Sequence, residues 1–361
     1  MRCEFSDLPG FSEDNHSEAW RTFFVSCQKM LAGTRSIRPG LSPDARFRSL
    51  WQRVVDIGPS LTNKQAETFF RENFRPYLLG ARQSYDALFT AYYRPQTVAS
   101  FVCTSDLSEP LYGRPSDLIS LNPFSQPVHL SGLASGRLCS DGRLQPYLTR
   151  AEINLKGVSA AQVLAYVSDP IEAFMIHVQG SASLQIDGQQ HDLTYSGRNG
   201  HPYVSIGKIL GSSGNLGFEE ANLLSLKRWV RANGQRPGQR GLALLEQNPS
   251  FIFFSMSPST DGTGPIGAAG HALTPFRSIA VDRSLWAYGT PFFIEAEIPW
   301  ITVDKSSTFR RTMIAQDTGS AILGSARADL FFGTGDKAGA LAGNIRHRGR
   351  MFVLLPKEQE L

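Results

Sequence analysis

Cysteine is scarce in this chain of 361 residues, and the spacing of its four copies excludes two kinds of site. Cys3, Cys27, Cys103 and Cys139 lie far apart, and no two of them form a Cys-x-x-Cys pair. A zinc knuckle and a thioredoxin-like redox pair both need that short spacing, so neither is expected. The four thiols are either free or joined in one or two disulfides, and the sequence leaves both states open.

Long apolar runs are also missing. No run approaches the length of a membrane span, and the first ten residues lack the apolar core of a signal peptide. Hydrophobic residues make up 41% of the chain and charged residues 19%, as in ordinary soluble globular proteins. We therefore expect a soluble protein, whether the sequence is complete, mature or begun too late in its gene.

Several catalytic signatures are absent or incomplete. The seven histidines show no His-Glu-x-x-His spacing and no Gly-x-Ser-x-Gly elbow occurs, which argues against metallohydrolases and serine hydrolases. Gly333-x-Gly335-x-x-x-Gly339 lacks the Lys-Ser/Thr ending of a phosphate loop and the Rossmann spacing. Asp317-Thr-Gly-Ser320 copies the aspartic-protease signature, but one copy supplies no second aspartate to share its proton. We expect no metal and no cofactor.

Charge of one sign is not concentrated either. The formal net charge is +4, and the 36 Lys and Arg residues are scattered among 32 Asp and Glu residues. Nucleic acid is therefore not an expected partner, although an acidic polymer would not be repelled. The 33 Gly, 21 Pro and 23 Phe residues favour many strands joined by tight turns. We predict a mainly β protein, with room for about two domains.

The first 80 residues carry helical patterns. Asn15 and Ser17 are capping residues for an amphipathic segment that runs to Leu31. Pro43 opens a second such segment and Thr62 precedes a third. The sequence therefore predicts a mainly β protein with a helical N-terminal segment.

Strand patterns begin near Asp86. A proline-rich stretch over 105–145 is interpreted as a crossing between domains. Short helices are predicted over 159–167, 219–232 and 239–247. Strands are predicted over 88–93, 173–178, 183–186, 192–195, 251–254, 278–281, 291–295, 312–315 and 351–355.

Two aspartates in a Gly-rich segment, Asp317 and Asp329, are the candidate catalytic residues. Ala, Leu, Phe and Phe stand around Asp329 at positions 328 and 330–332. Apolar surroundings raise the pKa of a carboxyl group toward the range in which it donates a proton near neutral pH. Asp329 is therefore a candidate general acid, although aspartates in such segments more often hold turns. Asp336 is expected to cap a short helix instead.

Aromatic and polar clusters could contact a sugar polymer. The pairs Tyr92-Tyr93 and Phe331-Phe332 suit stacking on pyranose rings, yet paired aromatics in strands are core residues at least as often. The turn Tyr195–Tyr203 gathers amide, guanidinium and hydroxyl groups, which suits a polar polymer but is common in ordinary loops. Neither cluster decides the function by itself.

Several motifs taken together, in order and spacing, resemble the membrane-bound lytic murein transglycosylase A family. The resemblance covers roughly residue 15 to the end of the chain. Its motifs are Phe89-Thr-Ala-Tyr-Tyr-Arg-Pro95, Val178-Gln-Gly-Ser181, Tyr195-Ser-Gly-Arg-Asn-Gly-His-Pro-Tyr-Val-Ser-Ile-Gly207, Leu273-Thr-Pro-Phe-Arg-Ser-Ile-Ala-Val-Asp282, Gly289-Thr-Pro291 and the segment from Asp317 to Gly343.

The resemblance implies a double-psi β-barrel domain that carries the catalytic aspartate, with a second β domain inserted into it and a substrate groove between them. On this layout, residues 1–105 and 249–361 form the discontinuous catalytic domain, with the N-terminal helices, and residues 106–248 form the insert. Family members cleave the β-1,4 bond between N-acetylmuramic acid and N-acetylglucosamine in peptidoglycan and leave 1,6-anhydromuramic acid ends.

The resemblance also assigns residues. It implies Asp329 as the single general acid and base, and Asp317 as a neighbour that either raises the pKa of Asp329 or orients its carboxyl group. Ala91, Arg94 and Ala182 depart from the family pattern, so substrate contacts near them are less secure. The implied substrate-binding residues are Gln179, Gly180, Ser181, Tyr195, Gly197 and Asn199, and Tyr92, Tyr93 and Phe331 are the candidate stacking residues.

The same resemblance implies a setting in the cell envelope. It predicts a periplasmic monomer, associated with the outer membrane, that acts on peptidoglycan glycan strands, with proteins of cell-wall synthesis or division as candidate partners. The family's lipoprotein signal is not part of this sequence, so the membrane association follows from the resemblance alone. A non-catalytic glycan-binding protein is the competing hypothesis.

Overall fold

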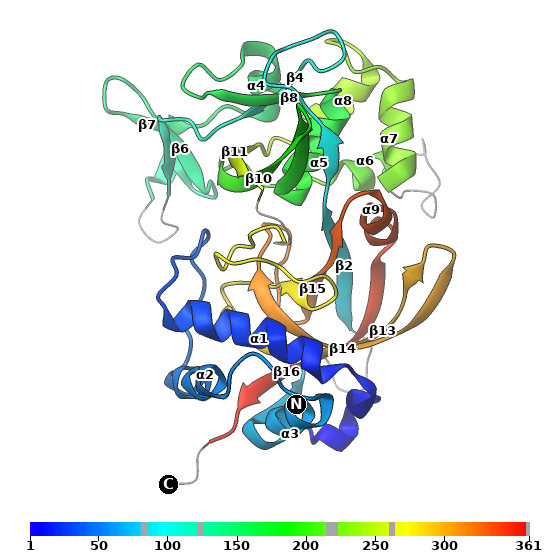
Figure 1. Cartoon of the computed structure of the whole chain (residues 1–361). Helices are drawn as coiled ribbons and strands as arrows, with labels where there is room; N and C mark the ends of the chain where they lie inside the picture. The colour runs from blue at the N-terminus through cyan, green and yellow to red at the C-terminus, as the bar shows by residue number, and fades with distance from the viewer. Residues whose placement is uncertain (81–85, 122–125, 214–222, 260–263, 359–361) are drawn as a thin grey trace. The chain divides into compact units, whose positions relative to one another are not determined.

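The computed structural model describes residues 1–80, 86–121, 126–213, 223–259 and 264–358. The chain folds into two compact units, and the first is built from three separate segments: Met1–Tyr93, Thr263–Gly333 and Lys337–Leu361. The second unit consists of Arg94–Gly262 with Thr334–Asp336. The mainly β fold class predicted from the sequence is confirmed (Figure 1).

The first unit contains a closed barrel of six strands. The strands follow the order β16-β13-β14-β12-β15-β2, and pairing of β2 with β16 closes the ring. β1 adds to the outside of β16 as a seventh strand. The strands are β1 (Phe74–Leu78), β2 (Ala87–Arg94), β12 (Ser278–Ala280), β13 (Pro291–Thr302), β14 (Lys305–Asp317), β15 (Arg327–Thr334) and β16 (Arg346–Pro356).

Three N-terminal helices pack against this barrel, as the sequence predicted. Asn15 caps the first helix by accepting from the N–H of Glu18, and Thr62 caps the third in a capping box. Figure 1 shows these helices beside the strands of the barrel. The helices of this unit are η1 (Phe5–Asp7), η2 (Phe11–Glu13), α1 (His16–Leu31), α2 (Ala45–Ile57), α3 (Asn63–Asn73) and α9 (Asp336–Ala342), whose first turn contains Asp336.

Aromatic side chains fill the space between the helices and the barrel. Trp20, Phe23 and Phe70 are fully buried and belong to one apolar cluster with Phe293 of β13 and Phe352 of β16. Burial of each large side chain stabilises the fold by about 1.5–3 kcal/mol. The helical segment is therefore part of the barrel's core and not an appendage.

A buried ion pair fastens the first helix to the barrel. Arg277, at the start of β12, donates two hydrogen bonds of 2.9 and 3.0 Å to Asp14, and both side chains are 1% exposed. Asp14 also accepts from the N–H of Thr312 on β14, while Arg277 donates to the carbonyl oxygen of the same residue. The two side chains thus neutralise each other's charge, and they also form hydrogen bonds with the N–H and the carbonyl oxygen of Thr312.

The second unit contains smaller sheets. Four strands follow the order β11-β10-β9-β3, and further strands form a pair, β4 with β8, and a triplet, β5-β6-β7. The strands are β3 (Gln96–Val98), β4 (Glu109–Tyr112), β5 (Leu118–Ser120), β6 (Ser135–Leu138), β7 (Leu144–Pro146), β8 (Val163–Val167), β9 (Ser181–Ile186), β10 (Gln189–Arg198) and β11 (Ile252–Pro258). The helices are η3 (Val128–Leu130), α4 (Arg150–Lys156), α5 (Pro170–Gln179), α6 (Ile206–Ser212), α7 (Leu223–Ala232) and α8 (Arg240–Glu246).

Two sequence predictions in this unit were wrong. The strand predicted over 173–178 is part of helix α5, which Asp169 caps, Pro170 opens and Gly180 ends in a left-handed conformation. A short apolar run fits either structure, and these end residues decide for the helix. The helix predicted over 159–167 is instead strand β8, whose residues pair with β4. The first residues of the helix predicted over 219–232 lie outside the described residues.

The chain passes between the two units at positions that differ from the predicted domain boundaries. The chain passes into the second unit after Tyr93 and leaves it after Gly262, whereas the sequence predicted these changes after residues 105 and 248. β3 pairs with β9 and β11 pairs with β10, so these strands belong to the second unit. The proline-rich stretch 105–145, interpreted as a domain crossing, lies wholly within that unit.

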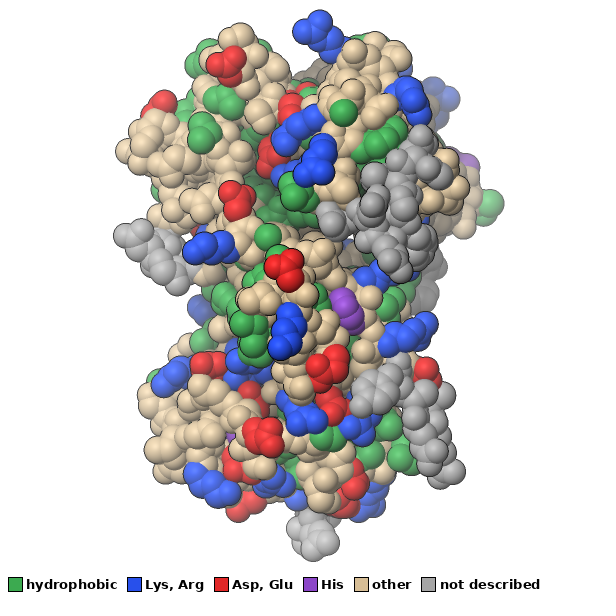
Figure 2. All heavy atoms as spheres, turned by 90° about the vertical axis from the view of Figure 1, so that its right-hand side faces the viewer, with side chains coloured by type: hydrophobic (Ala, Val, Ile, Leu, Met, Phe, Trp, Pro, Cys, Tyr) green, Lys and Arg blue, Asp and Glu red, His purple; other side chains and the backbone are tan. Residues whose placement is uncertain are grey.

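All four cysteines lie in the described residues, and all are free thiols. Figure 2 shows one face of the molecule, on which basic side chains lie among acidic ones. In the described part of the chain, no helix combines the length and apolar character that a membrane crossing requires.

The buried ion pair gives a stability prediction. Burial alone would raise the pKa of Asp14, but Arg277 and the N–H of Thr312 outweigh it and hold the pKa below its ordinary value. Asp14→Asn leaves the buried Arg277 with Glu18, which is 44% exposed, as its carboxylate partner, so the free energy of unfolding should fall by about 3 kcal/mol at neutral pH. Urea denaturation followed by tryptophan fluorescence measures this loss.

The pH dependence of that loss has a definite sign. A carboxyl group with a lowered pKa stabilises the fold above its unfolded pKa, and this stability disappears as the pH falls through the folded pKa. The difference between wild type and Asp14→Asn should therefore shrink in acid. Asp141→Asn, which removes the exposed pair with Arg143, is the control and should change little. Equal losses in the two variants would contradict the role of the buried pair.

Candidate active site

The two candidate carboxylates lie on strands that flank the same residue. Ala280 of β12 is paired with Asp317 of β14 on one side and with Asp329 of β15 on the other. Directly paired residues present their side chains on the same face of a sheet. Two strand spacings separate the two aspartates, which corresponds to roughly 10 Å between their Cα atoms. The small side chain of Ala280 leaves space between them.

A bulge in β14 brings Asp317 to this face. Ile279 pairs with Ala315, whereas the next residue, Ala280, pairs with Asp317, so Gln316 is an extra residue in β14. Without this extra residue, Gln316 would stand opposite Ala280 and Asp317 would move one place along. Gln316 is buried and donates to Ser26 of α1 at 2.7 Å, which holds the bulge in place.

Asp329 is held by one hydroxyl group. Thr90 of β2 donates a hydrogen bond to Oδ1 of Asp329. The Thr90 oxygen in turn accepts a hydrogen bond of 2.7 Å from Nη2 of Arg327, two residues before Asp329 on β15. Since the arginine can only donate, the single hydroxyl proton of Thr90 is directed at Asp329. Oδ1 is therefore the accepting oxygen, and a proton on this carboxyl group would be carried by Oδ2.

Asp317 is held by three donors. Its Oδ1 accepts from the N–H groups of Ala268 and Thr318, at 2.9 and 2.8 Å. Its Oδ2 accepts from the hydroxyl of Tyr92, at 2.9 Å. Donors of this kind stabilise the ionised form of a carboxyl group. Asp317 is therefore prepared to carry the negative charge of the pair.

The two carboxyl groups differ in the neighbouring groups that oppose the rise in pKa caused by burial. Burial raises the pKa of Asp329, and the nearby charge of Asp317 adds to the rise, while Arg327 and Thr90 lower it. Burial also raises the pKa of Asp317, but its three hydrogen-bond donors and the charge of Arg38 work against the rise. Asp317 thus gains more support for its charge. Of the two, Asp329 is the better holder of a proton.

Sequence reasoning found the two aspartates and Tyr92 but missed the groups that position them. Thr90 precedes Tyr92 by two residues and Arg327 precedes Asp329 by two, so each lies on the same side of its strand as the residue already identified. The alternation of a strand could have indicated both. The N–H of Ala268 and the charge of Arg38 come from loops, and no periodic pattern marks them.

The other aromatic candidates are core residues of the first unit. Phe331 is 1% exposed, and its ring centroid lies 5.3 Å from that of Tyr92. Tyr93 is 5% exposed and packs against Gly339 of α9, where even a Cβ atom would approach its ring to 2.7 Å. Only Tyr92 of the three is partly exposed beside the carboxylates.

The remaining candidates lie in the second unit. Gln179 ends α5, Gly180 follows it with a positive φ, and Ser181 begins β9 opposite Thr194, next to Tyr195. Four of the six therefore gather at one end of a strand pair, and Gln179, Ser181 and Tyr195 are partly exposed.

Asn199 and Gly197 are buried in that unit. The side chain of Asn199 donates to the carbonyl oxygens of Leu148 and Pro249 and accepts from the N–H of Phe251, all within 2.9 Å. These bonds occupy both of its amide protons. A Cβ atom on Gly197 would lie 2.6 Å from Nη1 of Arg114 and 3.0 Å from Cδ2 of Leu118, so the arginine side chain would have to shift. Both residues shape the strand end that carries Tyr195.

Family models match both parts of the chain. Residues 88–255 match the MltA specific insert domain, and residues 277–355 match the 3D domain. The first match covers most of the second unit, and the second covers the barrel strands that carry Asp317 and Asp329.

Solved structures show the same fold. A membrane-bound lytic murein transglycosylase from Agrobacterium tumefaciens superposes with a TM-score of 0.85 at 30% identity, covering 98% of this chain and 97% of that one. Escherichia coli MltA with bound chitohexaose gives a TM-score of 0.66 at 25% identity, covering 95% and 89%.

Curated relatives carry one name. The chain is 37% identical to membrane-bound lytic murein transglycosylase A of Vibrio cholerae over 213 residues, which are 57% of this chain and 55% of that protein. It is 32% identical to the Escherichia coli protein of the same name over 283 residues, which are 76% and 67% of the two chains. The match thus spans about half of one relative and two thirds of the other. From these matches and the shared fold, the chain belongs to the membrane-bound lytic murein transglycosylase A family.

Proposed function

We propose that this protein is a lytic transglycosylase that cleaves the β-1,4 bond between N-acetylmuramic acid and N-acetylglucosamine in peptidoglycan. The arrangement of Asp329 and Asp317 on either side of Ala280 is the observation that carries the proposal. One of these carboxyl groups is supported in its charged form by three donors, and the other is buried with fewer. Relatives with this fold are named lytic murein transglycosylases.

In the first step, Asp329 acts as a general acid. Its proton, on Oδ2, passes to the oxygen of the glycosidic bond as the bond from that oxygen to the anomeric carbon breaks. The leaving N-acetylglucosamine keeps the oxygen and the proton as a hydroxyl group. Positive charge develops on the muramic acid ring, and the ionised carboxylates of the site stabilise it.

In the second step, the nucleophile comes from the substrate. Most glycosidases need a second carboxylate as nucleophile or as base for a water molecule. Here the C6 hydroxyl of the muramic acid attacks its own anomeric carbon and gives its proton back to Asp329. The reaction is intramolecular, so it avoids the entropy cost of ordering a water molecule. No water is consumed, the product is a 1,6-anhydro ring, and Asp329 ends protonated as it began.

Asp317 has a supporting role in this scheme. Burial is the main cause of the raised pKa of Asp329, and the charge of Asp317 adds to the rise because it opposes ionisation of its neighbour. Tyr92 bridges to it from the strand that also carries Thr90. The sequence left two roles open for Asp317: to raise the pKa of Asp329 or to orient its carboxyl group. The charges of the site support the first role. Among the described residues no hydrogen bond joins the two carboxyl groups, so the second role has no such support.

The candidate substrate-binding residues fall into two groups, one partly exposed and one buried. Tyr92, Gln179, Ser181 and Tyr195 are partly exposed, and we assign the glycan contacts to them and to the backbone of Gly180. The buried candidates support these contacts from beneath: Tyr93, Gly197, Asn199 and Phe331. The protein is proposed to work as a monomer in the periplasm, and the membrane-bound relatives favour a place at the outer membrane.

Asp329→Asn tests the chemistry. The variant cannot donate a proton, so cleavage of peptidoglycan should fall by ~100- to 10,000-fold. Turbidity of cell-wall suspensions gives the rate, and mass spectrometry of the products identifies anhydro ends. Asp336→Asn, in the first turn of α9, is the matched control and should keep its activity. Unchanged cleavage by Asp329→Asn would favour a glycan-binding protein, and reducing ends in the wild-type products would indicate an ordinary muramidase.

Arg327→Gln tests the positioning of the acid. Arg327 lowers the pKa of Asp329 and fixes the direction of the Thr90 proton. Its removal should raise that pKa, so the basic limb of the profile of kcat/KM against pH should move to higher pH. Thr90→Val should shift the limb in the same direction because it removes the other group that lowers the pKa. Arg348→Gln, an exposed change on β16, should leave the limb in place; movement of the limb to lower pH would refute this assignment.

Asp329→Asn also has a predicted effect on stability. Burial raises the folded pKa of this carboxyl group, so wild type is most stable below the unfolded pKa and loses stability as the pH rises through the folded pKa. An amide carries no charge to bury and still accepts the hydrogen bond from Thr90. The variant should therefore have a higher Tm than wild type at neutral pH, and the gain should vanish in acid. A gain that persists unchanged in acid would rule out ionisation as its cause.

A further inference from the structure

A hollow that four basic side chains help to line lies in the first unit, away from the carboxylates. It has a volume of about 880 Å³ and is bounded by α2, the end of α3, the start of β1 and the end of β16. We call it the basic hollow. Its lining residues are Ala45, Arg46, Ser49, Leu50, Arg53, Glu72, Asn73, Arg75, Pro356, Lys357 and Glu358.

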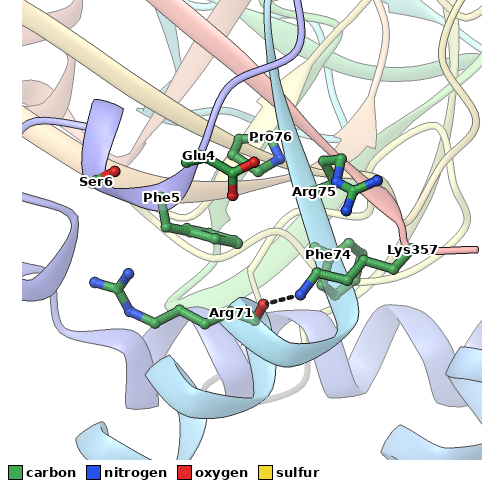
Figure 3. A pocket seen from close by; sticks show the side chains of 8 residues that line it. All are labelled: Glu4, Phe5, Ser6, Arg71, Phe74, Arg75, Pro76 and Lys357. Carbon is green, nitrogen blue, oxygen red and sulfur yellow. Dashed lines mark hydrogen bonds between the residues drawn. The ribbon is translucent and has the colours of Figure 1, made fainter.

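Two cations connect the basic hollow to a smaller one. Arg75 and Lys357 also line a cavity of about 310 Å³ that is shown in Figure 3. There Phe5, Phe74 and Pro76 supply apolar surface, and Lys357 donates to the carbonyl oxygen of Arg71 at 2.9 Å. The smaller cavity also contains one carboxylate, that of Glu4, beside the cations Arg71, Arg75 and Lys357.

The cations of the basic hollow are poorly compensated. Arg75 is half-buried, and among the described residues it has no hydrogen bond or ion pair for its guanidinium group. Arg53 donates to the amide oxygen of Asn73 at 2.9 Å and meets no carboxylate within the described chain. The acidic lining residues, Glu72 and Glu358, are exposed. Arg46 pairs with Asp44 at 2.7 Å and lies 4.0 Å from Glu358. Arg53 and Arg75 therefore differ from Arg46 in having no carboxylate partner among the described residues.

A partly exposed guanidinium group without a protein acceptor has its N–H donors available for an anion. Guanidinium groups bind carboxylates through two parallel hydrogen bonds, and this geometry makes arginine suited to the recognition of planar anions. The volume of the hollow lies within the range of sites for small organic ligands. These features together indicate a binding site for an anionic group that reaches Arg75.

Building on the proposed function, we infer that the basic hollow binds the carboxylate-bearing peptides of peptidoglycan. Those peptides are the anionic groups that a peptidoglycan strand brings to the protein, and the hollow offers them Arg53, Arg75 and Lys357. The protein would then prefer strands that carry peptides over strands from which the peptides have been removed.

The distance from the carboxylates fits a polymeric ligand. β16 pairs with Thr90 at Arg346, close to Asp329, and ends at Pro356 beside the basic hollow. Ten residues of extended strand separate these points, which is roughly 30 Å. A small molecule cannot contact both places, whereas a polymer with repeated peptides can. Binding at the hollow would hold the polymer near the acid and raise its local concentration there.

The test compares peptidoglycan that carries peptides with glycan from which an amidase has removed them. Wild type should bind the peptide-bearing material more tightly, by a ratio of about tenfold or more, in a sedimentation assay. The double variant Arg53→Gln/Arg75→Gln should lose this preference and bind both materials alike. Its binding should also depend less on salt concentration, because two cations are removed.

Arg21→Gln/Arg48→Gln is the matched control. It removes two positive charges from exposed positions on α1 and α2 that do not line the hollow, so the preference should remain. A wild type without preference, or an Arg53→Gln/Arg75→Gln variant that keeps it, overturns the inference. So does binding to anionic phospholipid vesicles that needs Arg53 and Arg75 without any preference for peptides.

The binding assay needs no turnover, so it separates this inference from the proposed function. If wild type forms no anhydro ends from either material, the proposed function fails. The sedimentation result still decides whether the basic hollow binds the peptides. If anhydro ends form but both materials bind equally to wild type, the function stands and the inference fails.

Discussion

The geometry of the site depends on the buried pair between Arg277 and Asp14. Arg277 stands directly before β12, and the pair holds both backbone groups of Thr312 on β14. It therefore fixes β12 against β14 just before the bulge at Gln316. Because Ala280 is two residues along β12, its place between Asp317 and Asp329 follows from this anchorage. An ion pair that contacts no substrate thus sets the relation between the two carboxylates.

The helical segment is part of the same arrangement. Asp14 precedes α1, and the bulge residue Gln316 bonds to Ser26 within α1. Arg38, from the loop after α1, contacts the carbonyl oxygen of Thr318, next to Asp317. The first 40 residues therefore do more than cover the barrel. They help to determine the shape and the charge of the barrel edge that carries Asp317.

The sequence predicted those parts of the structure that have local causes. The N-terminal helices have caps and a clear apolar period, and the β class follows from many short strands and turns. The strand predicted over 173–178 was wrong because a short apolar run fits both structures, and its end residues, Asp169 and Gly180, had to be weighed as well.

In the candidate site, too, only the features with local causes could be predicted from the sequence. Asp329 and Asp317 could be found from their local surroundings and from the family resemblance. Their pairing across Ala280 could not, because strand order and a one-residue bulge are set by tertiary contacts. For Asn199, the motif predicted a substrate contact. In the structure, its side-chain amide forms hydrogen bonds with backbone groups of the same unit.

The space above Ala280 has a consequence for the products. Two carboxyl groups on strands separated by one other strand leave room for a water molecule, which is the arrangement used by hydrolases that activate water. Under the proposed mechanism, hydrolysis is the competing side reaction, and the C6 hydroxyl of the substrate has to reach the anomeric carbon before water does. The proportion of reducing to anhydro ends would therefore report how dry this small space stays during each turnover.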